Sequence, residues 1–202
     1  AILLISVMVA SRYTTNTMPN HAHKRENSGY GSSLLTTSVI QTVLCHSVDN
    51  FTRYTVNAWG ATFLIQYTSL SVAGTVLSLQ EAVSVLSRLY FAKVRNCSPL
   101  NSAIAFTIQG LALAVAFDGR NLMVSATFLI LAAAASGLHS VGYRISYESG
   151  SSAGLGNTIA SVASALGPQL IGRYNAPSST FLCINVLGAA VSVGGIRNQK
   201  TL

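Results

Sequence analysis

The sequence holds very few charged side chains for its length. Of its 202 residues, 12 are Lys or Arg and 5 are Asp or Glu, so charged residues make up 8% of the chain. Soluble domains carry about 25% charged residues, because those side chains keep a folded surface in water. The mean hydropathy of +0.48 is also high. The composition therefore predicts an integral membrane protein whose main partner is the lipid bilayer.

The formal net charge of +7 does not indicate binding to nucleic acid. The basic residues are spread between long apolar runs, whereas a nucleic-acid interface needs them clustered on one face. Three cysteines lie far apart in the chain: Cys45, Cys97 and Cys183. This spacing predicts neither a disulfide framework nor a zinc site. We expect no metal and no cofactor.

Six stretches are apolar enough, and close enough to about 20 residues, to be spanning helices. They lie at 34–57, 71–92, 100–117, 122–143, 153–173 and 178–196. Pro99 and Pro177 stand just before two of them, and Pro is favoured in the first turn of a helix. The predicted fold is all-α, a polytopic membrane helix bundle with six transmembrane helices over residues 34–196.

The segments outside the six spans set the predicted topology. Residues 1–10, AILLISVMVA, are too short to span, so we expect the end of a truncated helix, followed by a polar cytoplasmic loop at 11–33 and a cytoplasmic tail at 197–202. With that loop inside, Arg120 and Arg173 fall on the outer side. Apart from Arg53, which lies within the first span, the other basic residues then fall on the cytoplasmic side, as the positive-inside rule expects: Arg12, Lys24, Arg25, Arg88, Lys93, Arg95, Arg144, Arg197 and Lys200. The chain is predicted to be multi-pass, with both ends cytoplasmic.

The first span contains His46, Asp49, Asn50 and Arg53, whose spacing places them on one helical face. Charged residues inside a bilayer are costly and rarely face lipid. One hypothesis is a polar stripe along a water-filled path, where Arg53 or His46 meets an anion. The other is an Asp49–Arg53 pair, four residues apart, that neutralises itself, together with polar contacts that hold helices to one another. Glu81 in the second span is either a proton-coupling group or an interhelical hydrogen-bond partner.

The run SSAGLGNTIASVASALGP at 151–168 consists mostly of small residues. Gly150 to Gly154 fit the G-x-S-x-G nucleophile elbow of hydrolases, which also requires a downstream acid and His. No Asp, Glu or His follows Glu148, so we do not expect an enzyme. Gly156, Ala160 and Ser164 instead have the small-xxx-small spacing that lets membrane helices approach closely.

Two stretches, SGLHSVGYRISY and GLGNTIASVASALGPQLIG, resemble the tenth and eleventh helices of the anion:cation symporter family of the major facilitator superfamily. This family includes the sodium–phosphate and vesicular glutamate transporters. The matching positions are Gly142-Tyr143, Gly154, Asn157, Pro168 and Gly172. The segment LCHSVDNFTRYTVNAWGATFL is similar to the seventh helix, with His46 at an Arg or His position, and YFAKVR resembles a basic cytoplasmic loop. The loop SYESGSS is shorter than its family counterpart and lacks a Pro-Arg-Tyr.

The resemblance implies the C-terminal half of a twelve-helix secondary transporter, whose N-terminal half is a missing partner. Such a protein moves an organic or inorganic anion, phosphate among them, with H⁺ or Na⁺ by alternating access. We expect the substrate and the coupling ion to meet a set of polar residues: His46, Asp49, Asn50, Arg53, Glu81 and Asn157. The alternative is a non-transporting membrane bundle, either a structural or interaction subunit or a degenerate fragment.

Overall fold

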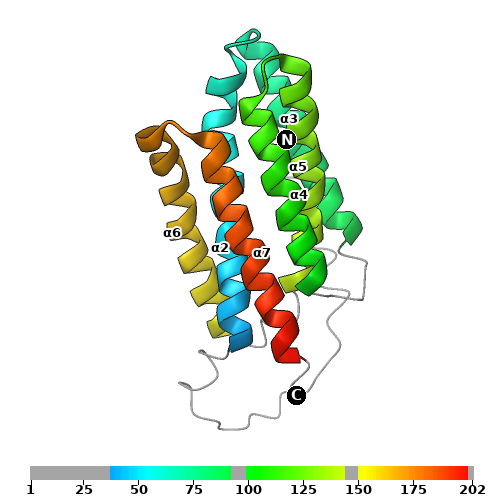
Figure 1. Cartoon of the computed structure of the whole chain (residues 1–202), viewed down its shortest axis with the longest axis vertical. Helices are drawn as coiled ribbons and strands as arrows, with labels where there is room; N and C mark the ends of the chain where they lie inside the picture. Colours follow the sequence, from blue (N-terminus) through cyan, green and yellow to red (C-terminus); the bar gives the residue numbers. More distant parts are fainter. Residues whose placement is uncertain (1–36, 92–98, 144–149, 200–202) are drawn as a thin grey trace. The chain divides into compact units, whose positions relative to one another are not determined.

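The computed structural model describes residues 37–91, 99–143 and 150–199, and these residues are almost entirely helical. Figure 1 shows the described helices: α2 (Thr37–Leu64), α3 (Leu70–Phe91), α4 (Pro99–Asp118), α5 (Leu122–Tyr143), α6 (Gly150–Tyr174) and α7 (Pro177–Gln199). The described ranges contain no strand, which confirms the all-α prediction. The predicted helix end at 1–10 and the predicted loop at 11–33 lie outside these ranges.

The helix bounds lie within three residues of the predicted ranges, except at the end of α2. Helix α2 continues to Leu64, where the sequence predicted an end at 57, because the run AWGATFL is apolar and contains no helix breaker other than one Gly. Helix α7 continues to Gln199 and so includes the first residues of the predicted tail.

Short polar connections end one helix and begin the next. Asn121 Oδ1 accepts a hydrogen bond from the Val124 N–H at 2.9 Å, which caps the start of α5. Asn175 ends α6 with a left-handed φ of 47°, and its N–H donates to the Ile171 carbonyl at 2.8 Å. Asn is one of the few residues that tolerates this conformation. Pro177 then begins α7, as the sequence predicted.

Each helix packs on a small set of neighbours. Helix α4 packs on α5 and α7, α2 packs on α6 and α7, and α3 packs on α5. The contacts are similar in the first three helices and the last three, if α2 corresponds to α5, α3 to α6 and α4 to α7. The contact of α2 with α6 then corresponds to that of α5 with α3, and the contact of α4 with α5 corresponds to that of α7 with α2. Figure 1 shows that α2 and α5 run in opposite directions, so the two sets of three helices are related by inversion.

Within the described residues, four helices are long and apolar enough to cross a membrane: Leu70–Phe91, Pro99–Asp118, Leu122–His139 and Pro177–Gly194. Many large apolar side chains on their surfaces are exposed, among them Leu70, Leu86 and Met123. A bilayer is the surrounding in which such a surface is stable. The chain is thus a membrane-embedded helical protein. Six complete spans stay a prediction, since α2 is too polar and α6 too rich in Gly and Ser to be counted with the four.

Helix α6 lies against α2 through its small residues. Gly156, Ala160 and Gly167 are buried, and a side chain at Gly167 would overlap the Thr55 hydroxyl. The indole of Trp59 donates to the Pro168 carbonyl at 2.9 Å. Small residues at this spacing let the two backbones approach closely, which is how helices associate without a hydrophobic driving force.

Candidate functional site

Two ion pairs join α2 to α3. Asp49 and Arg53 lie one turn apart on α2, and Glu81 and Arg88 lie two turns apart on α3. Because consecutive helices joined by a short connection run antiparallel, the later residue of α2 meets the earlier residue of α3. Arg53 therefore pairs with Glu81, and Asp49 pairs with Arg88.

The Arg53–Glu81 pair is a fork and is partly open. Arg53 Nη2 lies 3.0 Å from Glu81 Oε2, and Arg53 Nε lies 3.4 Å from Oε1. The Asn57 amide donates to the same Oε1 at 2.7 Å. The side chains of Arg53 and Glu81 are 36% and 29% exposed. A bidentate arginine at an open edge can exchange one carboxylate for another oxyanion, because its planar donors fit either group.

The Asp49–Arg88 pair is more deeply placed. Arg88 Nη2 donates to Asp49 Oδ2 at 2.9 Å, and the Asp49 side chain is only 3% exposed. Among the described residues, Asp49 Oδ1 and Arg88 Nε are buried and have no hydrogen-bond partner. Buried charges of this kind depend on their partner, because removal of one leaves the other unpaired in a medium of low dielectric constant.

Polar side chains of α4 and α5 lie behind the charges. His139 is fully buried, and its Nε2 lies 2.7 Å from Gln109 Oε1, so the imidazole donates to the amide oxygen. Its ring stacks on Phe106, with centroids 3.9 Å apart. Ser84 of α3 and Ser136 of α5 share a hydrogen bond of 2.9 Å. A polar layer thus continues from α2 and α3 into the interior of the bundle.

A small cavity lies between the ion pairs and this layer. Its volume is about 10 Å³, and its polar lining comes from Thr52, Arg53, Gln80, Ser84, Arg88, Gln109 and Ser136. That volume is about the space one water needs. Gln80 Oε1 is buried without a partner in the described part of the chain, which fits a site that holds one water. The cavity is too small for an anion in this conformation.

The structure brings together three of the six predicted site residues: Asp49, Arg53 and Glu81. His46 and Asn50 lie half-buried on α2. Asn157 is exposed on α6, where its carbonyl accepts the Ser161 hydroxyl at 2.8 Å, and it does not line the cavity.

The structure does not pair Asp49 with Arg53, but both residues make polar contacts between helices, which the second hypothesis also included. Both residues use partners on α3 instead, 39 and 28 residues away in the chain. The i, i+4 spacing places both side chains on one face of α2, and the face they share lies against α3, which supplies the partner of each.

Sequence reasoning missed the role of Arg88, which it assigned to the cytoplasmic end of the second span. Arg88 is indeed in the last turn of α3, but its side chain reaches back to Asp49. A signal was present, because Glu81, Ser84 and Arg88 have the 3, 4, 7 spacing of one helical face. Gln109 and His139 gave no comparable signal, since each is a single polar residue in an apolar run.

No protein-family model matches the chain, and no curated protein is similar to it. The G-x-S-x-G sequence, Gly150 to Gly154, lies in the first turns of α6. The resemblance to the anion:cation symporters therefore stays a prediction that rests on the residues quoted for it.

Proposed function

We propose that this chain is part of a secondary transporter in which protonation of Glu81 lets a substrate anion take the place of its carboxylate on Arg53. The observation that carries the proposal is a bidentate, partly open arginine–glutamate pair on the membrane-embedded bundle. A charge in a bilayer is costly and usually marks an ion or substrate path.

Charge balance gives the mechanism. While Glu81 is ionised, it neutralises Arg53 and occupies both arms of the guanidinium fork. A proton on Glu81 removes that negative charge and frees the fork for a phosphate or carboxylate of the substrate. The site stays neutral in both states, so the proton and the anion bind together and leave together. This coupling is the requirement for symport.

Asp49 and Arg88 have a different role in this mechanism. Their pair is more buried and lies one turn away, so it holds α2 in register with α3 while Arg53 changes partner. Asn57 then keeps a hydrogen bond to Glu81 in either protonation state, because its amide can donate to a carboxylate or accept from a carboxylic acid.

The arrangement of the helices also supports a transporter. Its contacts are nearly preserved when α2–α4 are exchanged with α5–α7, and the two triplets run in opposite directions. Inverted repeats of three helices are found inside each half of major facilitator transporters, where the path lies between two such halves. We propose that a second half, not contained in this chain, covers the open edge of the Arg53–Glu81 pair.

The test is uptake by the full-length protein in proteoliposomes, with inorganic phosphate and glutamate as separate probes and an imposed proton or Na⁺ gradient. Arg53→Ala is expected to reduce uptake about ten- to a hundredfold, the worth of a charge-assisted hydrogen bond. Arg53→Lys keeps the charge but loses the fork, so it should recover only part of the activity.

Glu81→Gln separates coupling from binding. We expect this variant to exchange anions across the membrane while uptake no longer responds to the proton gradient, because the side chain is permanently neutral. Arg120→Ala, in the exposed connection before α5, is the matched control and should behave like the unmodified protein. Unchanged uptake in Arg53→Ala would refute the proposal.

A non-transporting bundle is the second candidate. The observation in its favour is that both acids inside α2 and α3 are already paired with arginines, as in a purely structural contact. Under this alternative, the Arg53 and Glu81 variants change the unfolding free energy of the protein and no probe anion is taken up in any arm.

A further inference from the structure

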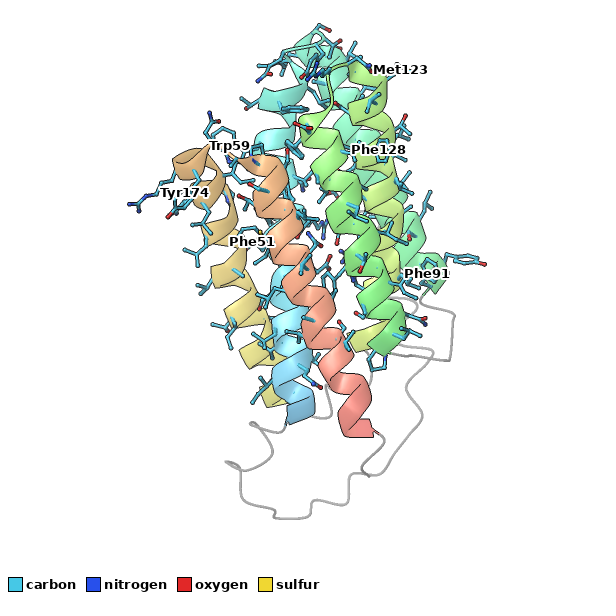
Figure 2. The ribbon with its side chains drawn as sticks, in the orientation of Figure 1. Phe51, Trp59, Phe91, Met123, Phe128 and Tyr174 are labelled. Carbon is cyan, nitrogen blue, oxygen red and sulfur yellow. The ribbon has the colours of Figure 1, made fainter. Side chains whose placement is uncertain are left out.

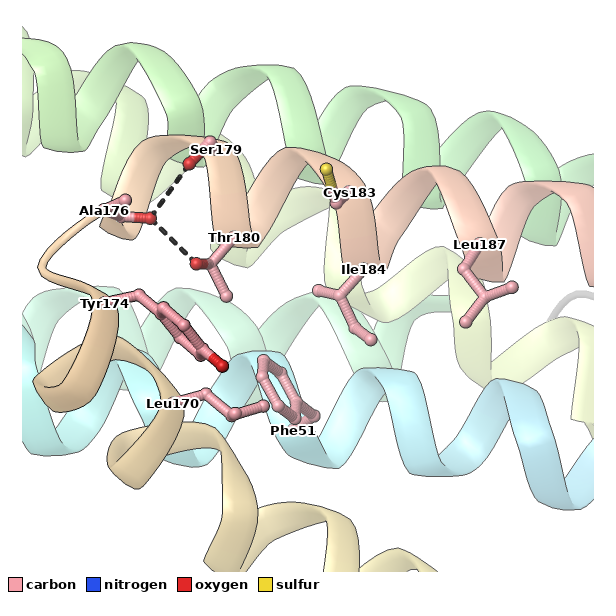
Figure 3. A pocket seen from close by; sticks show the side chains of 9 residues that line it. All are labelled: Phe51, Leu170, Tyr174, Ala176, Ser179, Thr180, Cys183, Ile184 and Leu187. Atoms are coloured by element: carbon pink, nitrogen blue, oxygen red, sulfur yellow. Dashed lines mark hydrogen bonds between the residues drawn. The ribbon is translucent and has the colours of Figure 1, made fainter.

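A groove opens between α6 and α7, on the side of α2 away from the ion pairs (Figure 3). Its volume is about 510 Å³, within the range of about 300–1,000 Å³ that is common for ligand sites. Thr180, Ile184 and Leu187 point from α7 toward Leu170 and Tyr174 of α6, and Phe51 of α2 lies at the floor.

The groove exists because its two walls are held by different neighbours. Helix α6 packs on α2, and α7 packs on α4 and α2, whereas α6 and α7 contact each other little although only Asn175 and Ala176 connect them. The groove is open toward the outside of the bundle, so a molecule from the surroundings can enter it.

The chemistry of the walls indicates which kind of ligand would fit the groove. The Ser179 and Thr180 hydroxyls both donate to the Ala176 carbonyl, at 3.2 and 2.8 Å, so they offer little to a polar ligand. The remaining wall is mainly aliphatic or aromatic. Along α7 the lining runs from Ser179 to Leu187, which is about 12 Å at 1.5 Å per residue. The groove thus fits part of a hydrocarbon chain.

A charged side chain lies next to the Tyr174 end of the groove. Arg173 is exposed in the last turn of α6, and its guanidinium carbon lies 6.0 Å from the centre of the Tyr174 ring, which lines the groove. Figure 2 shows Tyr174 and Trp59 near the same end of the bundle. Aromatic rings and arginines gather where a membrane meets water, at the level of the lipid headgroups.

We propose that the α6–α7 groove binds an anionic phospholipid. One acyl chain lies between Leu170 and Leu187 over Phe51, and the phosphate meets Arg173 beside Tyr174. Such a lipid is a component of bilayers, and its chain-plus-phosphate chemistry matches an apolar groove with Arg173 next to its lining residue Tyr174. A bound lipid holds α6 and α7 apart at a fixed distance and completes the packing that the helices leave open.

The test is native mass spectrometry of the full-length protein with palmitoyl-oleoyl phosphatidylglycerol or phosphatidylcholine added in detergent. Arg173→Gln should weaken phosphatidylglycerol binding about fivefold, the effect of one basic residue at a membrane surface, and leave phosphatidylcholine binding unchanged. Arg120→Gln, an exposed arginine in the connection at the same end of the bundle, is the matched control and should change neither affinity.

Filling the groove tests the acyl-chain site separately. Leu187→Trp places an indole ring in the groove, where it takes up space that an acyl chain would fill. The binding of both lipids should weaken about fourfold for each methylene that the ring excludes. Val186→Trp is the control, because Val186 is exposed on α7 but does not line the groove.

A photoreactive acyl-chain phosphatidylglycerol locates the lipid in the unmodified protein, so the result does not depend on any variant folding. Cross-links to peptides containing Leu170 or Leu187 are expected. The proposal is overturned if cross-links fall elsewhere, if a second copy or another helix occupies the groove, or if Leu187→Trp and Val186→Trp affect binding equally.

Discussion

Helix α2 presents one side to α6 and the opposite side to α3, and the two contacts are built differently. Toward α6 it presents Phe51, Thr55 and Trp59, which meet Gly167, Pro168 and Gly172. Toward α3 it presents Asp49, Arg53 and Asn57, which meet Arg88 and Glu81. The two rows are offset by two residues, about 200° around a helix of 3.6 residues per turn.

The difference shows how one membrane helix can be held rigidly on one side and adjustably on the other. The α6 contact depends on steric fit and on a neutral hydrogen bond, and neither changes with protonation or with a bound ion. The α3 contact depends on charge, so a proton or an anion can change it. In the proposed mechanism, α2 and α6 therefore move as a unit, while the α2–α3 contact responds to the substrate.

The largest expected effect is on the buried ion pair. Arg88→Met leaves the Asp49 carboxylate buried without a cation, and we expect the unfolding free energy in detergent to fall by about 3–5 kcal/mol. Asp49→Asn should lower the unfolding free energy by less, because the Arg88 side chain that remains is 28% exposed and can reach a polar surrounding.

The double variant Asp49→Leu with Arg88→Met is the control, because it removes both charges. It should be more stable than Arg88→Met alone, since well-packed apolar residues replace a buried pair at little cost. If Arg88→Met is as stable as the unmodified protein, the Asp49–Arg88 pair does not hold α2 to α3.

The contact between α2 and α6 should be weakened by a larger side chain and not by a change of charge. Gly167→Val forces side-chain atoms into the Thr55 hydroxyl and close to the Phe51 carbonyl, 3.1 Å from the first added carbon. We expect a loss of about 1–3 kcal/mol in the unfolding free energy. Gly154→Val on the same helix is the matched control, because no atom lies within 4 Å of its added carbon. Equal losses for the two variants would mean that helix propensity, and not the α2–α6 fit, is being measured.

The smallest expected effect is on a single hydrogen bond of the same contact. Trp59→Phe keeps an aromatic ring against Gly172 but removes the donor to the Pro168 carbonyl. The unfolding free energy should fall by about 1 kcal/mol, the usual net worth of a hydrogen bond. Transport should keep its dependence on the proton gradient. A changed dependence would show that the α2–α6 contact also responds to the coupling ion.

Most helix positions could be predicted from the sequence, because a run of apolar residues in a bilayer must satisfy its backbone hydrogen bonds internally. The predicted range 122–143 coincides with α5, and 71–92 lies within one residue of α3 at both ends. The prediction ended the first span at 57, whereas α2 follows the apolar run on to Leu64.

The candidate site could be predicted only in part. The helical spacing alone placed Asp49 and Arg53 on one face and identified Glu81 as a buried acid. It did not identify Gln109 or His139, because isolated polar residues in apolar helices have no periodicity of their own. Arg88 was missed although it shares a helical face with Glu81 and Ser84. The groove between α6 and α7 had no sequence signal, since it depends on which neighbours hold each wall.

The sequence by itself determined that the chain is helical and embedded in a membrane, and which residues share a face, because these properties depend on local periodicity and transfer free energy. Only the tertiary structure decided that Asp49 pairs with Arg88 and Arg53 with Glu81. Coulomb energy falls with distance, so each charge takes the partner that the packing of α2 against α3 brings nearest, and that packing joins residues far apart in the chain.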